Sequence, residues 1–163
     1  MLDQLMQIIK QQGQESVVEN QDVPNEHNEG VMQEAGSSLF ASLQQMVQNG
    51  KLEQVTDLLK GNTDGGTTNQ LSENVAGNIA SKFGINAESA KNIAGSLIPK
   101  VLSSLTNKAN DTNDNSIDLQ GMLGSLTGGN IQGTINSLGS QFGLDKDKDG
   151  DVDFKDITKM FGQ

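Results

Sequence analysis

The widest apolar surface in the sequence belongs to a stretch whose hydrophobic residues recur at intervals of three and four. This spacing places them on one face of an α-helix, which has a period of about 3.6 residues. Because no other segment carries so broad an apolar face, we expect this helix to be central and the most buried in the fold. Its apolar residues are Ala90, Ile93, Ala94, Leu97, Ile98, Val101, Leu102 and Leu105.

Local signals shape this central helix. The sequence Phe83-Gly84-Ile85 predicts a Schellman stop of the preceding helix. In that motif Gly84 takes the left-handed conformation and Ile85 provides the hydrophobic contact. Asn86 is placed to cap the central helix. Pro99 lies inside the apolar pattern, so we expect it to kink the helix or break it locally.

Four other segments carry narrower helical stripes. We expect Gly13 to weaken or end the first of these helices, and Asn25 or Asn28 to cap the second. Asn49-Gly50 should stop the second, and Gly61 should end the third. The stretch Asn62–Gln70 reads as a loop, because Gly, Thr and Asn dominate it. The stripes are Leu2, Leu5, Met6 and Ile9; Val31, Ala35, Leu39, Leu43, Met46 and Val47; Leu52, Val55, Leu58 and Leu59; and Leu71, Val75, Ile79 and Phe83.

The C-terminal third of the chain has a different composition. The stretch Asn107–Ser116 is rich in Asn and Asp and is the strongest linker candidate. Short apolar stripes follow within an uncharged, Gly-rich segment that runs from Leu119 to Leu144. No strand-like alternation persists anywhere, so the pattern predicts an all-α fold. We divide the chain into a helical bundle core (1–106), a linker (107–116) and a segment of short helices with an acidic loop (117–163).

The charge of the chain limits its partners. Its formal net charge is -10 at pH 7, and it contains no arginine. Phosphate groups are usually bound by Arg and Lys clusters, so we expect no nucleic-acid partner and favour cations. No stretch approaches the ~18 consecutive apolar residues of a membrane span. The N-terminal sequence lacks the features of a signal peptide, which predicts a cytoplasmic protein.

An acidic stretch near the C-terminus, LDKDKDGDVDFKDITKMF (144–161), matches the pattern of an EF-hand calcium loop. Aspartates occupy its first, third, fifth and twelfth positions, and Gly150 is sixth, where the chain must turn sharply. Calcium takes about six to eight oxygen ligands, and without a cation these converging carboxylates would repel one another. The predicted ligands are Asp145, Asp147, Asp149, Asp151 through its backbone carbonyl, Asp153 directly or through water, and Asp156.

Two features distinguish this loop from the common EF-hand. Asp156 stands at the twelfth position, where Glu is usual, and in this respect the loop is similar to dockerin-like loops. EF-hands also normally pair, but no second loop is evident. The alternating Asp111, Asn113 and Asn115 are not followed by the required Gly or terminal acid. We therefore expect calcium affinity in the weak range of ~10⁻⁵–10⁻³ M.

The helical body also contains four stretches with the character of a known family. They are MLDQLMQIIKQQ, VPNEHNEGVMQEAGSSLFASLQQMVQNG, AESAKNIAGSLIPKVLSSL and GMLGSLTGGN. On these stretches, residues 1 to about 143 resemble the uncharacterised bacterial YidB-like family. The resemblance implies a multihelical bundle in which other helices surround a central one. It implies no established activity and transfers no functional residue.

Motifs of enzymatic chemistry are missing from the sequence. There is no cysteine, P-loop, dinucleotide fingerprint or HExxH motif, and Ser37 and Ser38 have no evident base. His27, the single histidine, reads as a surface residue. We expect a non-enzymatic calcium-binding protein, built as a multihelical bundle around a central helix with a C-terminal EF-hand-like loop and exit helix. Calcium would act as a sensor input or as a structural staple. The alternative is a structural or self-association helical module with an incidental cation site, acting as a homo-oligomer or with an unknown protein partner.

Overall fold

The computed structural model describes residues 2–62, 65–110 and 124–127. Within these ranges the chain is helical and forms no strand, as the all-α prediction requires. Residues 124–126 form a short helical turn in a second unit of the chain. The elements of the first unit are α1 (Leu2–Gly13), the π-helical segment η1 (Gln14–Val18), the 3-10 turn η2 (Asn25–His27), α2 (Asn28–Gln48), α3 (Leu52–Lys60), α4 (Gly65–Phe83) and α5 (Ala87–Asn110).

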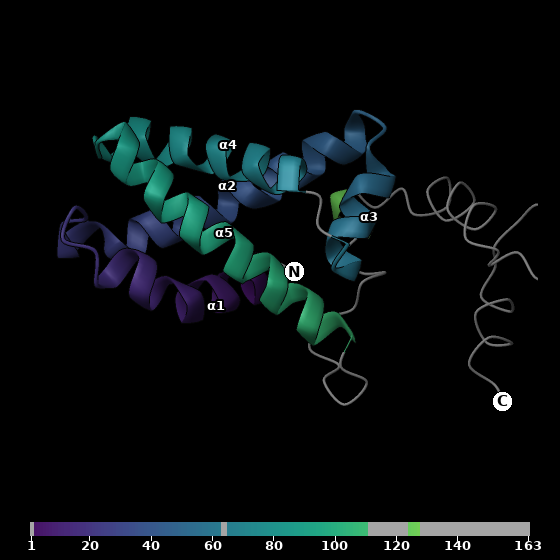
Figure 1. The fold of residues 1–163 in the computed structure, drawn as a ribbon, viewed down its shortest axis with the longest axis horizontal. Coiled ribbons are helices and arrows are strands. Elements are labelled where there is room, and N and C mark those ends of the chain that lie inside the picture. Colours follow the sequence, from purple (N-terminus) through teal and green to yellow (C-terminus); the bar gives the residue numbers. More distant parts are fainter. Residues whose placement is uncertain (1, 63–64, 111–123, 128–163) are drawn as a thin grey trace, which may run out of the picture. The chain divides into compact units, whose positions relative to one another are not determined.

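Helix α5 is the central helix of this bundle. It runs between α1 and α4 and also contacts α3 and η1 (Figure 1). Helix α2 packs against α1 and α4. All eight apolar residues predicted to form the central face are at most 1% exposed. The prediction of a central, most buried helix is therefore confirmed.

Glycines end three of the helices as the sequence predicts. Gly50, Gly61 and Gly84 have φ values of 76°, 89° and 65°, the left-handed conformation that glycine adopts without a steric penalty. After α3, the Asn62 amide donates to the Asp57 carbonyl at 2.9 Å, which completes a Schellman motif. Gly84 instead donates to the Ala80 carbonyl at 3.0 Å, the bond of the simpler αL motif, and Ile85 is buried.

The start of α5 also agrees with its prediction. The Asn86 side-chain oxygen accepts a hydrogen bond from the Glu88 amide at 2.8 Å. This bond satisfies one of the backbone donors that a helix leaves unpaired in its first turn. Asn86 is therefore a true cap of α5.

The predicted loop at Asn62–Gln70 is wrong over most of its length, because α4 already begins at Gly65. Glycine is tolerated in a first turn, where the backbone amides need no partner within the helix. The first turns also bury Thr68, Leu71 and Ser72 against the bundle. Tertiary burial therefore outweighs the loop-like composition of this stretch.

The N-terminal region differs from its prediction in two places. Gly13 ends the α-helical hydrogen-bond pattern, but the chain continues as a π-helix to Val18. A Cβ on Gly13 would lie 2.7 Å from Met32 Sδ, so this glycine permits close packing of α1 on α2. The predicted side-chain cap at Asn25 or Asn28 is not formed at η2 or α2. A backbone bond from His27 to Pro24 at 2.7 Å starts this region instead.

Helix α5 is longer than the sequence indicates. It passes through Pro99 without a break, and Pro99 lies on its exposed face. It also continues to Asn110, so the first four residues of the predicted linker 107–116 are helical. The remainder of that linker, and most of the predicted segment 117–163, lie outside the described residues.

Candidate functional site

The six predicted calcium ligands lie outside the described residues. These are Asp145, Asp147, Asp149, Asp151, Asp153 and Asp156, and their prediction stays one made from sequence. Within residues 2–62, 65–110 and 124–127, no group of three or more His, Cys, Asp or Glu side chains is placed to hold a metal ion. The candidate site described below is therefore one formed by uncharged residues of the helical body.

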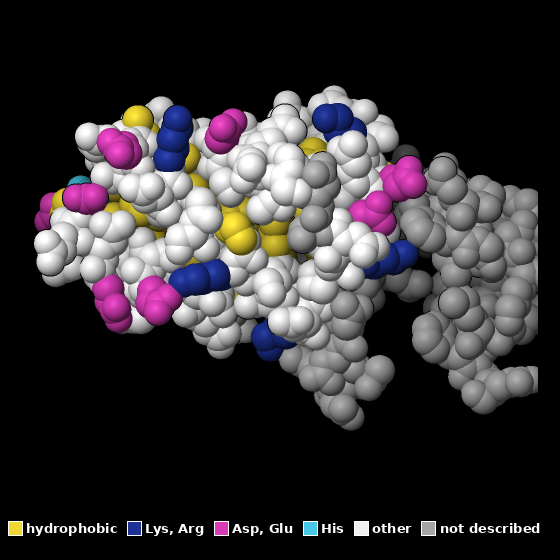
Figure 2. Space-filling model, in the orientation of Figure 1, with side chains coloured by type: hydrophobic (Ala, Val, Ile, Leu, Met, Phe, Trp, Pro, Cys, Tyr) yellow, Lys and Arg dark blue, Asp and Glu magenta, His cyan; other side chains and the backbone are white. Residues whose placement is uncertain are grey.

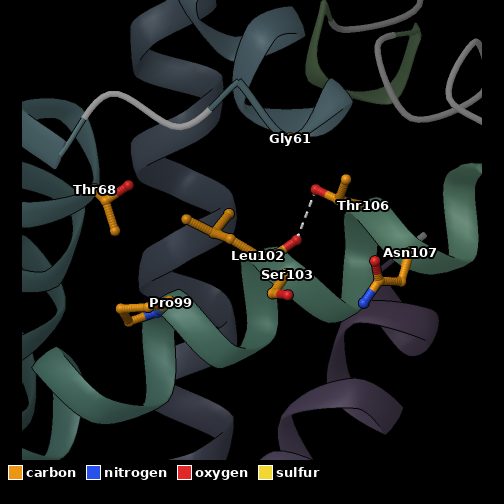
Figure 3. Close-up of a pocket in the computed structure, with 7 residues that line it drawn as sticks. All are labelled: Gly61, Thr68, Pro99, Leu102, Ser103, Thr106 and Asn107. Carbon is orange, nitrogen blue, oxygen red and sulfur yellow. Dashed lines mark hydrogen bonds between the residues drawn. The ribbon is translucent and has the colours of Figure 1, made fainter.

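The helical body contains a cavity where the end of α3, the start of α4 and the second half of α5 meet. Its volume is about 280 Å³. The lining residues come from all three elements and carry no formal charge (Figure 3). They are Gly61, Thr68, Pro99, Leu102, Ser103, Thr106 and Asn107.

Backbone geometry brings the wall of this cavity together. Gly61 has a left-handed φ of 89°, and a Cβ built on it would lie 2.8 Å from the Thr106 methyl carbon. Glycine therefore allows the α3 terminus to approach α5 closely. The Thr106 hydroxyl bonds to the carbonyls of Leu102, at 3.0 Å, and Leu58, at 3.3 Å. Thr106 thus connects α5 to the last turn of α3.

Thr68 is the buried polar residue of this wall. It is 9% exposed, and among the residues that the structure describes its hydroxyl oxygen has no hydrogen-bond partner. The sequence interpretation missed Thr68 because it assigned residues 62–70 to a loop. A signal for it exists, since Thr68 lies three residues before Leu71 and seven before Val75, on the same helical face.

A separate polar network joins α2 to α4. Lys82 Nζ lies 2.5 Å from Glu34 Oε2, and the Ser38 hydroxyl donates to Glu34 Oε1 at 3.0 Å. The Asn78 amide donates to Ser38 Oγ at 2.9 Å. Ser38 is 4% exposed, so its hydroxyl is bonded and closed to solvent. This arrangement stabilises the helix pair, and it does not present Ser38 as a nucleophile.

The hydrogen bond from Lys82 lowers the pKa of Glu34 below its usual value of 4.5, opposed by partial burial of the carboxylate. A lowered folded-state pKa stabilises the protein above the unfolded value, and this stability is lost as pH falls through the folded pKa. We expect Glu34→Gln to cost about 1 kcal/mol at pH 7 and to flatten the loss of stability below pH 4.5. Urea unfolding at neutral and acidic pH measures both effects.

Glu29→Gln is the matched control for this prediction. Glu29 lies on the same helix and faces Lys10 Nζ at 3.6 Å, but its side chain is 81% exposed. Glu34 is 16% exposed. An exposed ion pair contributes little, so the control should change the neutral-pH stability by less than about 0.5 kcal/mol. Equal effects of the two substitutions would contradict the role assigned to Glu34.

His27 belongs to a small contact at the end of α4. Its ring centroid is 5.7 Å from that of Phe83, with the planes tilted by 51°. A Cβ on Gly30 would lie 2.8 Å from the Phe83 ring, so Gly30 makes room for this ring on α2. The His27 side chain is 40% exposed, and its nearest acid, Glu26, lies 3.9 Å away. The half-exposed ring packs on Phe83 beside one carboxylate.

Comparison with known proteins adds no information about these sites. No protein-family model, curated protein or solved structure matches the chain. The resemblance to the YidB-like family stays a prediction from the sequence. In the part of the chain that the structure describes, no helix is long and apolar enough to cross a membrane.

Proposed function

We propose that this chain is a non-enzymatic calcium-binding protein that uses a single EF-hand-like loop. The observation that carries the proposal is the agreement of residues 145–156 with the loop pattern at the first, third, fifth and sixth positions, together with an acid at the twelfth. The proposed ligands are Asp145, Asp147, Asp149, Asp151, Asp153 and Asp156.

The pattern supports calcium because each position meets a separate requirement. Oxygen ligands at alternate residues supply the coordination number that calcium prefers, and Gly150 permits the turn between them. The apolar Val152 stands at the eighth position, where EF-hand loops carry a residue that packs inward. Phe154, Ile157 and Phe161 then recur at helical spacing, which supports an amphipathic exit helix.

The unusual terminal acid supports modest affinity. Asp156 is one methylene shorter than the Glu of the common loop, so bidentate ligation requires a closer approach of the chain. Lys146, Lys148 and Lys155 also offset part of the negative charge of the loop. We propose a dissociation constant of ~10⁻⁵–10⁻³ M, which suits a weak sensor or a structural calcium ion.

Calcium titration followed by calorimetry and NMR tests the proposal. We expect saturable binding and a shift of the Gly150 amide resonance, because the central glycine of an EF-hand responds to occupancy. Asp145→Ala with Asp149→Ala should weaken binding by at least about 100-fold, since loss of two ligand oxygens exceeds the 10- to 100-fold effect of outer-shell changes.

The control replaces two carboxylates that lie outside the loop, Asp111→Ala with Asp114→Ala. It makes the same change in net charge and should leave the affinity unaltered. Equal weakening by both pairs would show a general charge effect instead of a site. Nanomolar affinity would contradict the proposed weak loop. If calcium changes neither the Gly150 amide resonance nor the helix content, a calcium switch is ruled out.

Sedimentation with and without calcium separates this proposal from a self-association module. Compaction or dimerisation that requires calcium would support a sensor. Oligomers that form equally without calcium would favour the module, with an incidental cation site. The uncharged, Gly-rich segment from Leu119 to Leu144 is the sequence feature that supports this alternative.

A further inference from the structure

The only Asn-Gly pair in the sequence lies at the corner between α2 and α3. Asn49 is the residue that follows the last turn of α2, and Gly50 comes next with a left-handed φ of 76°. Both residues are exposed, and a Cβ added to Gly50 would have no heavy atom within 4 Å. Figure 2 shows acidic and basic side chains at the surface over α3. The pair is therefore open to solvent beside a polar helix.

An asparagine followed by glycine carries both partners of a reaction. Asparagine is among the thermally labile residues. After the Gly50 amide loses its proton to solvent base, its nitrogen bonds to Asn49 Cγ, and the side-chain nitrogen leaves as ammonia. Water then opens the succinimide ring to aspartate or isoaspartate, so the net change consumes one water and releases one ammonia. Glycine leaves the attack unhindered, because it has no side chain.

The folded corner holds this pair away from the reaction. The Gly50 amide donates to the Val47 carbonyl at 3.0 Å. The Lys51 amide donates to the Met46 carbonyl at 2.9 Å, which completes a Schellman motif. Asn49 has a ψ of 13°, and ring closure requires rotation about this bond until the Gly50 nitrogen lies alongside Asn49 Cγ. In the closed corner the attacking nitrogen is therefore both bonded and misdirected.

Rotation at Asn49 also displaces α3, because only residues 49–51 join the two helices. Helix α3 contacts α2 and α5. It is held there by Val55, Leu58 and Leu59, which are at most 2% exposed. The geometry that reacts is thus reached when α3 leaves this packing.

We propose that Asn49 is a site of spontaneous deamidation, and that undocking of α3 controls its rate. Conversion to isoaspartate adds a methylene carbon to the backbone and places a carboxylate at the C-terminal end of α2. The longer backbone disturbs both Schellman bonds, and the carboxylate is unfavourable beside the negative end of the helix dipole. The reaction therefore makes permanent an opening of the corner that is transient in the parent chain.

Incubation of the full chain in mildly alkaline, calcium-free buffer, followed by peptide mapping, measures the reaction. Cleavage after glutamate releases the peptide Ala35–Glu53, in which Asn49 is the only asparagine. We expect product in the native chain, formed about 10- to 100-fold more slowly than in guanidinium chloride, because only the open state reacts. Equal rates in the two states would overturn control by the fold. No product after about 100 half-lives of the unfolded chain would overturn the site itself.

Val55→Ala tests whether α3 controls the rate. Val55 is 0% exposed, so its truncation weakens the packing of α3 and should raise the native rate at Asn49 about fivefold or more. Val31→Ala is the matched control, because Val31 is also 0% exposed but lies at the other end of α2. It should change the rate by less than about twofold, since local opening of the corner does not depend on packing there. Equal acceleration by both variants would show that global unfolding is the route and overturn the role of α3.

Hydrogen exchange of the aged chain tests the consequence. Amides of α3 should exchange at least about fivefold faster in the fraction modified at Asn49 than in the unmodified fraction, with amides of α1 unchanged. Asn49→Gln is the control for ageing, because the longer side chain closes its ring far more slowly, and α3 should keep its slow exchange. Equal protection of α3 in the modified and unmodified fractions would overturn the proposed loosening. Faster α3 exchange in aged Asn49→Gln would trace it to another change and overturn it as well.

Discussion

Ile98→Ala should lower the free energy of unfolding of the helical body by about 2–5 kcal/mol. Ile98 is 0% exposed and lies on the buried face of α5. Truncation removes apolar area from the core and leaves a cavity that the surrounding helices fill only in part. A domain of this size is typically stable by about 5–15 kcal/mol, so the substitution removes a large share. Urea unfolding followed by far-ultraviolet circular dichroism measures the loss.

Asn92→Ala is the control on the same helix. Asn92 is exposed, and alanine has the higher helix propensity, so the expected change is within about 0.5 kcal/mol of zero. A comparable loss in both variants would indicate that helix content, and not burial, determines the effect. A loss below about 1 kcal/mol for Ile98→Ala would contradict the central position of α5.

The centre of the fold could be predicted because its signal is local and repeated. All eight residues of the α5 face follow helical spacing, and all eight are buried. The helix ends at Gly50, Gly61 and Gly84 could be predicted equally well. A residue that follows a helical stripe and takes the left-handed conformation is usually glycine. Asn86 is another local signal, because its oxygen has only to reach the amide two residues on.

The rest of the fold depends on contacts that local patterns do not encode. The Ser16 and Ser96 hydroxyls lie 3.0 Å apart and join η1 to α5 across 80 residues of sequence. The sequence pattern indicates Gly13 only as a helix stop. In the fold, the absence of a side chain on Gly13 also allows Met32 to approach α1 closely. The loop-like composition of residues 62–70 predicts a later start of α4. Burial of Thr68 and Leu71 against the bundle favours the earlier start that the structure shows.

The two candidate sites also differ in this respect, because one is defined by local sequence and the other by tertiary contacts. The proposed calcium loop is a local pattern of Asp residues around Gly150, and it can be proposed from sequence without any tertiary contact. The cavity at the junction of α3, α4 and α5 is formed by three elements that lie far apart in the sequence, so only the assembled helices reveal it.

Pro99 provides the second large effect, with the opposite sign. Proline lacks an amide proton, so within α5 it leaves the Gly95 carbonyl, four residues earlier, without its helical donor. In a helix interior proline is about 3 kcal/mol less favourable than alanine, and its rigidity in the unfolded chain offsets about 0.4–1 kcal/mol of that cost. Because Pro99 is exposed, Pro99→Ala should raise the free energy of unfolding by about 2 kcal/mol.

Gly95→Ala is the matched control for this substitution. Gly95 is exposed, and a Cβ added there has no heavy atom within 4 Å, so alanine fits without repacking. It should gain only about 0.5–1 kcal/mol, from backbone entropy alone. Urea unfolding of the two variants under the same conditions compares their gains in stability.

Hydrogen exchange identifies the source of the gain. In Pro99→Ala the new amide at position 99 should exchange slowly, because it donates to the Gly95 carbonyl inside a continuous helix. A stabilised variant whose new amide exchanges at the rate of a free peptide would trace the gain to another cause. Loss of stability would mean that the bundle has adapted its packing to the proline, and that α5 requires the local geometry that Pro99 imposes.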